Sequence, residues 1–220
     1  MTNQINITAK LCRDSSVIDS IIGNESIVGD FSRVRNSILG NYTTVDRQNF
    51  LECVTVGDYS YTGPWNMIFH CNIGKYCSIS YGVTIGPPEH NYKRLSTHPF
   101  IYNPRFGIVD TENKEIKDWR LKKKISIGND VWIGCNSVIL RGVNIADGVV
   151  VGANTLVNRD VPPYAIVVGN PAKIVKYRFT GNVIQKLLDI KWWDWSIEKI
   201  KKNCHLFIDE NIEDAIKNIK

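Results

Sequence analysis

The feature that most constrains the fold of this chain is a repeat of six residues. Aliphatic residues recur at this spacing at Ile127, Ile133, Ile139, Ile145, Val151 and Val157. The position four residues after each is again small or branched, at Val131, Ser137, Val143, Val149, Thr155 and Val161. Shorter runs have the same period, at Ile73, Ile79 and Ile85 and, less strictly, at Ile22, Val28, Val34, Leu39, Val45 and Leu51.

A period of six fits neither an α-helix nor an amphipathic strand over this length. It fits a solenoid in which each short strand turns a corner and repeats, so that inward aliphatic residues stack from coil to coil. A sandwich with coincidental spacing is the alternative, and six consecutive steps argue against it. We expect corner glycines to supply backbone freedom; they follow the key aliphatic residue at positions 23, 29, 40, 57, 74, 86, 128, 134 and 152.

The repeat is interrupted between residues 87 and 124. It stops at Pro87-Pro88 and resumes at Ile125. A solenoid tolerates an insertion at a corner, and long insertions often carry function. Aromatic and titratable residues gather here, as in a pocket wall, at His90, Tyr92, His98, Phe100, Tyr102, Phe106 and Trp119. A loop that merely packs on its own coil is the alternative.

Length and composition agree with one domain, or a domain with a small appendix. The chain has 220 residues and a mass of 25.0 kDa, with 43% hydrophobic and 22% charged residues. Its net charge of +5 includes the run 122–124. This charge indicates either a solvated face or an anionic ligand. Nucleic acid is not expected as a partner, because no basic helix is interleaved with aromatic residues.

The sequence also favours a cytoplasmic protein. The first residues, "MTNQINITAK", show no export signal, and no apolar stretch is long enough to span a membrane. Six cysteines are scattered without a C-x-x-C pair. We expect them to be reduced and mostly buried, and to form neither disulfides nor a zinc site.

The chain changes character after Phe179, where the hexads end. Apolar residues at helical spacing predict an amphipathic helix from about Val183 to Trp193, a break at 194–196, a second helix from about Ser196 and a short third helix near the end. The tryptophans are expected to form core or contact surface. We therefore divide the chain into a repeat domain, residues 1–179 with the insertion 87–124, and a helical segment, residues 180–220.

Six motifs occur in an order that is typical of one protein family. They are "VGDYSY", "IGKYCSI", "HNYKRLSTHPF", "GNDVWIG", "GNPAK" and "LLDIKWWDW". Over about residues 56–200 the chain resembles the hexapeptide-repeat acyltransferases, most closely the xenobiotic acetyltransferases, which include streptogramin and type B chloramphenicol acetyltransferases. This resemblance implies a mainly β fold, a left-handed parallel β-helix with C-terminal helices. The first fifty or so residues form additional coils.

The resemblance implies an acetyl-CoA-dependent O-acetyltransferase with a small hydroxylated acceptor. A loop histidine that matches His90 is the general base, and the hydroxyl attacks directly without an acyl-enzyme. Imidazole suits this role because it changes protonation near neutral pH. The resemblance assigns the acceptor pocket to Tyr59, Tyr61, His98, Pro99 and Phe100, and coenzyme A to Trp132, Gly134, Gly152, Ala153, Lys173 and Arg178.

The same resemblance implies a homotrimer with active sites between subunits. No metal is expected, because metal-dependent relatives with this fold use three histidines at coil spacing and no H-x-x-x-x-H occurs here. The acceptor is either an antibiotic or a sugar of a surface polysaccharide, which the additional coils slightly favour. A non-catalytic binding protein is a third alternative. The oxyanion donors, and any assistance to His90 from Glu89 or His70, stay open.

Overall fold

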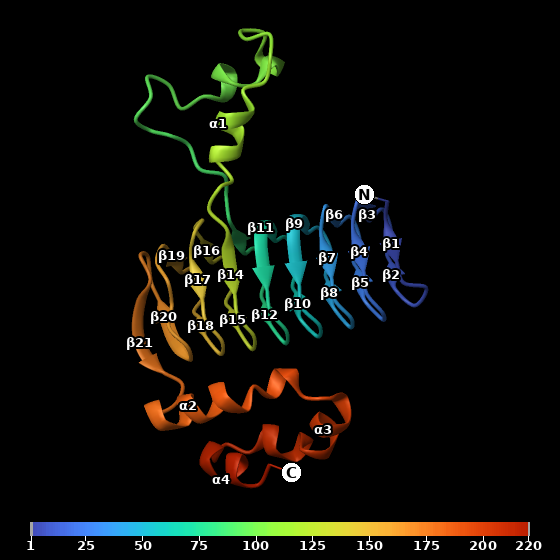
Figure 1. Ribbon diagram of the computed structural model, residues 1–220, viewed down its shortest axis with the longest axis vertical. Coiled ribbons are helices and arrows are strands. Elements are labelled where there is room, and N and C mark those ends of the chain that lie inside the picture. Colours follow the sequence, from blue (N-terminus) through green and yellow to red (C-terminus); the bar gives the residue numbers. More distant parts are fainter. Residues whose placement is uncertain (1, 220) are drawn as a thin grey trace.

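The computed structural model describes residues 2–219. The chain forms a column of stacked coils, with a loop projecting from one side and helices on the opposite side (Figure 1). Successive coils repeat after 17 or 18 residues: Leu39 pairs with Val56 in parallel register, and Ile133 pairs with Val151. One turn therefore takes three hexads or one residue fewer, and the stacked coils agree with the predicted solenoid.

Two parallel sheets line the column. The first has twelve strands: β1 Gln4–Ile5, β3 Ser16–Ile18, β4 Ile21–Ile22, β6 Arg33–Arg35, β7 Ile38–Leu39, β9 Phe50–Val56, β11 Met67–Ile73, β13 Thr84–Ile85, β14 Ile125–Ile127, β16 Val138–Ile139, β17 Asn144–Ile145 and β19 Leu156–Val157. The second has nine: β2 Lys10–Leu11, β5 Ile27–Val28, β8 Thr44–Val45, β10 Tyr61–Thr62, β12 Ser78–Ile79, β15 Trp132–Ile133, β18 Val150–Val151, β20 Ala165–Val168 and β21 Lys173–Tyr177. Among the strands of residues 2–219, only the β20–β21 pair is antiparallel.

The core of the column is the stack of hexad residues. Ile133, Ile139 and Val151 are fully buried, and the second repeat position is buried as well, as at Ser137 and Val149. Buried serine hydroxyls bond to backbone carbonyls, as Ser137 Oγ does to Gly152 O at 2.9 Å. The prediction of a mainly β parallel helix is confirmed, and the architecture is consistent with the left-handed form.

The corner glycines have a different role from the one expected. Left-handed backbone at the corners is adopted by other residues, for example Tyr42, Tyr59 and Tyr76, with φ between +55° and +61°. A Cβ on Gly57 instead lies 2.6 Å from the carbonyl carbon of Gly74 in the next coil. The prediction of backbone freedom is therefore wrong for most of these glycines, which provide space between coils. Gly86 is the exception, with φ +70°.

The insertion leaves the column after β13 and returns at β14. It contains the short helices η1 Pro99–Ile101, η2 Pro104–Phe106 and α1 Lys114–Trp119. Arg141, which is 5% exposed, lies at its root. Its Nε donates to Pro87 O at 3.2 Å, and its Nη1 to Leu121 O and Lys123 O at 3.4 and 3.5 Å. One guanidinium thus holds both ends of the loop.

The C-terminal segment contains the predicted helices, but the first ends at Ile190 rather than at about Trp193. The helices are α2 Gly181–Ile190, η3 Trp192–Asp194, α3 Ile197–Lys202, η4 Cys204–Ile208 and α4 Ile212–Lys217. Ser196 caps α3, so the break falls where the sequence places it. Trp192 packs on Tyr76 with ring centroids 4.8 Å apart, and Asp194 pairs with Lys75 Nζ at 2.8 Å. These contacts fasten the helices to the coil corners.

Two further expectations concern membranes and cysteines. Within residues 2–219, no helix has the length and apolar character needed to cross a bilayer. All six cysteines are free, but only Cys71 and Cys77 are buried. The expectation that most thiols are buried is therefore wrong: four of the six lie at corners or in the helical segment, where side chains reach solvent.

Candidate active site

His90 lies on the loop in a defined hydrogen-bonding arrangement. Its Nδ1 is 2.7 Å from the carbonyl oxygen of Thr97, and its Nε2 is 2.9 Å from Nη2 of Arg120. A carbonyl only accepts and a guanidinium only donates. These partners therefore place the proton on Nδ1 and leave the lone pair on Nε2. This is the tautomer in which Nε2 can remove a proton.

Arg120 connects His90 with both arms of the loop. Its Nε donates to Glu89 O at 2.9 Å, and its Nη1 donates to the Tyr102 hydroxyl at 2.6 Å. Its guanidinium also lies over the Tyr102 ring, 5.6 Å from the centroid. Tyr102 is the one buried residue of the loop. The imidazole is thus positioned by an arginine that is itself held at three points.

The space around His90 within one chain is very small. The cavity measures about 10 Å³ and is lined by His90, Asn91, Arg94, Ser96, Thr97, Ile101, Tyr102, Ile116, Trp119 and Arg120. This volume holds one water at most. An open groove of about 610 Å³ lies on the same part of the loop, with Arg94, Ile116 and Trp119 in both linings. A single chain therefore gives His90 no enclosed site for two substrates.

His98, Pro99 and Phe100 form a local cluster on the same loop. His98 Nδ1 accepts from the backbone N–H of Phe100 at 3.1 Å and caps η1, of which Pro99 is the first residue. The His98 ring also contacts Phe106, with centroids 4.6 Å apart. The structure brings these three predicted acceptor residues together.

Tyr59 and Tyr61 lie on the column. The Tyr59 ring stacks between Tyr42 and Tyr76, at 5.1 and 4.9 Å, in a ladder that ends on Trp192. Trp192 belongs to the helical segment, which lies on the side of the column opposite the loop (Figure 1). Tyr61 is exposed on β10. Within one chain, Tyr59 and His90 are therefore not brought together.

The residues predicted for coenzyme A fall into two groups. Trp132 is 56% exposed on β15, and its strand pairs with β18, which Gly152 follows. Gly134 and Ala153 are in contact across these coils. Lys173 is exposed at the start of β21. Trp132 and Lys173 thus lie in the second sheet and the other three at the corners that follow its strands, whereas Arg178 turns toward the helical segment.

Arg178 is engaged in an ion pair. Its Nη1 donates to Asp130 Oδ2 at 2.8 Å and to Gly148 O at 2.9 Å. Burial raises the pKa of the Asp130 carboxyl, and the charge of Arg178 opposes this shift. A cavity of about 470 Å³ between the last coils and the helices also has Arg178 in its lining. One nitrogen of the Arg178 guanidinium, Nη1, is thus already hydrogen-bonded within the chain.

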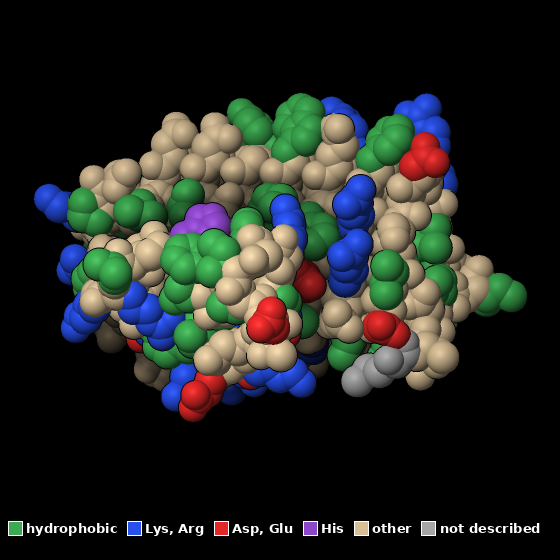
Figure 2. Space-filling model, turned by 90° about the horizontal axis from the view of Figure 1, so that it is seen from above, with side chains coloured by type: hydrophobic (Ala, Val, Ile, Leu, Met, Phe, Trp, Pro, Cys, Tyr) green, Lys and Arg blue, Asp and Glu red, His purple; other side chains and the backbone are tan. Residues whose placement is uncertain are grey.

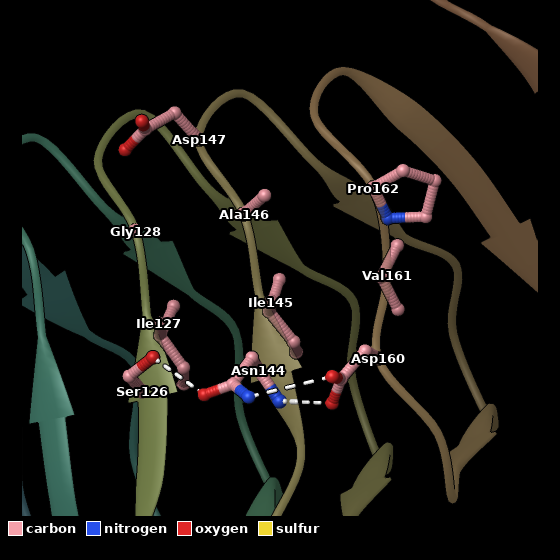
Figure 3. Close-up of a pocket in the computed structure, with 10 residues that line it drawn as sticks. All are labelled: Ser126, Ile127, Gly128, Asn144, Ile145, Ala146, Asp147, Asp160, Val161 and Pro162. Carbon is pink, nitrogen blue, oxygen red and sulfur yellow. Dashed lines mark hydrogen bonds between the residues drawn. The ribbon is translucent and has the colours of Figure 1, made fainter.

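A surface groove of about 430 Å³ crosses the coils that follow the loop. Figure 3 shows its polar row, in which Ser126 Oγ donates to Asn144 Oδ1 at 3.0 Å and the Asn144 N–H donates to Asp160 Oδ1 at 2.8 Å. None of the residues predicted for the site lines this groove. In the part of the chain from residue 2 to residue 219, no group of three His, Cys, Asp or Glu side chains is arranged to hold a metal ion.

Comparison with known proteins agrees with the repeat. Residues 124–159 match the family model described as bacterial transferase hexapeptide (six repeats). A chloramphenicol acetyltransferase of Klebsiella aerogenes is 40% identical over 146 residues, 64% of this chain and 67% of that protein. A virginiamycin A acetyltransferase of Staphylococcus aureus is 35% identical over 185 residues, 77% of this chain and 82% of that protein. The chain belongs to the xenobiotic acetyltransferases of the hexapeptide-repeat family.

A third relative supports the same assignment. A probable macrolide acetyltransferase of Lysinibacillus sphaericus is 40% identical over 141 residues, which is 63% of this chain and 77% of that protein. The chain is therefore an acetyltransferase, and the alternative of a non-catalytic binding protein is set aside.

The loop contacts also reveal two residues, Arg120 and Arg141, that the sequence analysis did not identify. Arg120 and Arg141 stand in or near basic and apolar stretches, and no local pattern connects either of them with His90 or Pro87.

Proposed function

We propose that this acetyltransferase transfers acetyl from acetyl-CoA to a hydroxyl group, with His90 as the general base. The observation that carries the proposal is the pair of hydrogen bonds on the His90 ring. They hold the proton on Nδ1 and the lone pair on Nε2. A base in this protonation state accepts a proton without first losing one, once Arg120 has moved off Nε2.

The proposed reaction is direct transfer. Nε2 of His90 removes the hydroxyl proton while the acceptor oxygen attacks the thioester carbonyl carbon. The tetrahedral intermediate collapses, the C–S bond breaks, and the proton on His90 passes to the departing sulfur. A base in this role contributes roughly 10²- to 10⁴-fold to the rate.

We propose a homotrimer with each site between two subunits. The projecting loop and the small cavity at His90 support this arrangement, because a neighbouring column can supply the missing walls. The exposed Tyr61 and Trp132 are suited to that face, and His98, Pro99 and Phe100 to the opposite wall. Tyr59 stays in the acceptor set from the resemblance alone. The six free thiols favour the cytoplasm as its location.

For coenzyme A we propose the second sheet beside Trp132, Gly134, Gly152 and Ala153. An extended pantetheine arm can lie along stacked coils, and the exposed Lys173 ammonium suits a phosphate. Arg178 belongs to this set from the resemblance, and its pairing with Asp130 works against the assignment. We also retain the division into a repeat domain, 1–179, and a helical segment, 180–220.

The acceptor has two candidates. The printed names of the relatives, chloramphenicol, macrolide and virginiamycin A acetyltransferase, favour a hydroxylated antibiotic. The coils before residue 56, which lengthen the column beyond the motif-bearing part, favour a larger acceptor such as a polysaccharide sugar.

The test is thiol release from acetyl-CoA with chloramphenicol, a streptogramin A and a panel of sugars. Wild type is compared with His90→Ala and with His205→Ala, an exposed histidine in the helical segment. We expect His90→Ala to lose roughly a hundredfold or more and His205→Ala to retain activity. Unchanged release in His90→Ala would remove His90 as the base. Light scattering on the same samples tests the trimer.

A further inference from the structure

The loop around His90 carries most of the net charge of the chain. Residues 87–124 contain nine lysines and arginines against five aspartates and glutamates. The loop is therefore net +4 in a chain of net +5. Figure 2 views the molecule from the loop side, where Lys and Arg side chains are more prominent than Asp and Glu.

At His90 itself the positive charge is not matched by a carboxylate. Arg120 donates only to neutral acceptors, namely Glu89 O, the Tyr102 hydroxyl and the His90 ring. The carboxylate of Glu89, the residue that precedes His90, pairs instead with Lys123 Nζ at 3.3 Å. Throughout residues 2–219, no carboxylate lies within ion-pair distance of Arg120. A charged guanidinium held in this way is ready to accept an anionic partner.

A second arginine, Arg141, adds to the positive charge near Arg120. Arg141 is buried, donates only to carbonyl oxygens, and has an Nη2 without a partner among the described residues. Burial lowers the pKa of Arg141, the charge of Arg120 lowers it further, and Glu89 opposes both. The two guanidiniums are thus close enough to interact, and Glu89, the carboxylate that opposes them, already pairs with Lys123.

The position of Arg120 sets a condition on the acceptor. Its Nη2 occupies the lone pair of Nε2, which is where a hydroxyl proton must arrive. A neutral acceptor has to displace Arg120 Nη2 from His90, and it gives the guanidinium only an uncharged hydrogen-bond partner instead. An acceptor with a carboxylate or phosphate gives Arg120 a charge-assisted, two-pronged partner and frees Nε2 in the same step.

We propose that the acceptor carries a carboxylate or a phosphate close to the hydroxyl that is acetylated, and that Arg120 pairs with this anion. The proposal rests on the proposed function, since it takes His90 as the base. The phosphates of coenzyme A do not meet the condition, because the pantetheine arm separates them from the thioester that reacts beside His90. The anion therefore belongs to the acceptor, which favours an acidic sugar over a neutral antibiotic such as chloramphenicol.

The experiment compares acceptors that differ only in the anion. Glucuronic acid is paired with glucose, N-acetylneuraminic acid with its methyl ester, and glucose 6-phosphate with glucose, so that carboxylate and phosphate are distinguished. kcat/KM is measured by thiol release for wild type, Arg120→Gln and Arg120→Lys. Lys114→Gln is the control, since Lys114 is exposed on the same loop and contacts neither Arg120 nor His90. Circular dichroism verifies that each variant is folded.

We expect at least one acid to exceed its neutral partner roughly tenfold to a hundredfold in wild type, the range of a hydrogen bond to a charged group. The ratio falls to near one in Arg120→Gln, falls partway in Arg120→Lys and persists in Lys114→Gln. Because the ratio is taken within each variant, a general loss of loop order leaves it unchanged. No preference in wild type, or a preference that survives in Arg120→Gln, overturns the proposal.

The His90→Ala variant separates this proposal from the proposed function. If His90 is the base, this variant loses thiol release with acid and neutral acceptors alike. If thiol release is absent with every acceptor even in wild type, binding of the same pairs is compared by saturation-transfer NMR. Selective binding of an acid by wild type and not by Arg120→Gln supports the anion site independently of catalysis. Equal binding within each pair, or none, overturns it.

Discussion

The column and the loop are held together by different forces. In the column, aliphatic residues such as Ile79, Ile133 and Ile139 are almost fully buried, and every coil stacks on the next. In residues 87–124 only Tyr102 is buried, and the chain is fixed by contacts to Arg120 and Arg141. Apolar burial therefore maintains the column, whereas a few polar contacts shape the loop.

This difference separates stability from activity along the chain. Repeat proteins derive stability from many similar neighbour interactions, so each coil matters about equally. A loop with little buried surface contributes little to global stability, but it can position a base with a few well-placed donors. Substitutions are expected to sort accordingly: in the column they change the free energy of unfolding, and in the loop they change catalysis.

The largest effect is expected for a matched pair of isoleucine truncations. Ile79→Ala removes a side chain that is 1% exposed in β12 and should cost roughly 2–5 kcal/mol of unfolding free energy. Ile108→Ala, at a loop residue that is 66% exposed, should change it by less than about 0.5 kcal/mol. Urea unfolding followed by circular dichroism measures both. Similar losses of unfolding free energy in the two variants would contradict the view that the column, and not the loop, determines stability.

The next prediction tests why the corners contain glycine. In Gly57→Ala the new methyl group meets backbone atoms of Gly74 and Lys75 at 2.6–2.8 Å, so overpacking should cost about 1–3 kcal/mol. Gly181→Ala is the control, because open space surrounds that position at the start of α2. Its variant should be neutral or up to about 1 kcal/mol more stable. Equal behaviour of both variants in thermal melts would mean that the coils at Gly57 separate enough to admit a methyl group, and close packing would then not explain this glycine.

The column was predictable because its signal is periodic. Each step of six residues places an aliphatic side chain in the core, and Ile127 to Val157 can be assigned inward without knowing anything else. The break after Gly86 and the cap at Ser196 also follow from local rules about insertions and helix starts. What the period cannot show is how a corner is filled, and the expectation for glycine failed there.

The site was less predictable because its contacts are not periodic. His90 was singled out by the motif around it, but Arg120 is 30 residues away and Arg141 lies in a coil beyond the loop. Their contacts with His90, Pro87 and Leu121 arise only when the two loop arms come together. Tyr59 shows the converse: its motif suggested an acceptor wall, and the fold stacks its ring between Tyr42 and Tyr76.

A smaller effect on stability, with a clear effect on the loop, is expected for Arg141→Met. The substitution removes a buried guanidinium with an unpaired Nη2, so the unfolding free energy should change by less than about 1 kcal/mol. Both loop ends lose their anchor, and thiol release should fall roughly tenfold, which corresponds to about 1.4 kcal/mol in the barrier. Endoproteinase Glu-C, for which neither arginine nor methionine is a cleavage site, should cleave the loop after Glu112 or Glu115 faster than in wild type.

The control for this experiment is Arg105→Met. Arg105 is exposed on the same loop and lies over the Phe106 ring without bonding to either loop end. Its cleavage by endoproteinase Glu-C should match wild type. If Arg141→Met is cleaved at the wild-type rate and unfolds more easily, the arginine stabilises the column rather than the loop.

The smallest effect is a pH dependence at the boundary of the two regions. His70 ends a coil beside the loop root, and burial lowers its pKa, as does the charge of Arg141, while Glu52 opposes them. The folded protein thus binds this proton less readily than the unfolded chain, whose imidazole titrates near the ordinary value of about 6.5. The stability linked to His70 is present above that value and is lost as the pH falls through the folded-state pKa.

His70→Asn tests this linkage with little change in the backbone. His70 has φ +48°, and Asn36, at the equivalent corner two coils earlier, has φ +47°, so asparagine suits the position. Between roughly pH 7.5 and pH 5.5 the urea midpoint of wild type should fall, and it should fall less in His70→Asn because the variant has no imidazole to protonate there. The other three histidines are common to both proteins, so the difference between the two slopes isolates His70. Identical slopes would mean that water reaches the corner beside the loop root and that His70 titrates there as it does in the unfolded chain. Burial in the column would then have no effect on the pKa of a side chain at this corner.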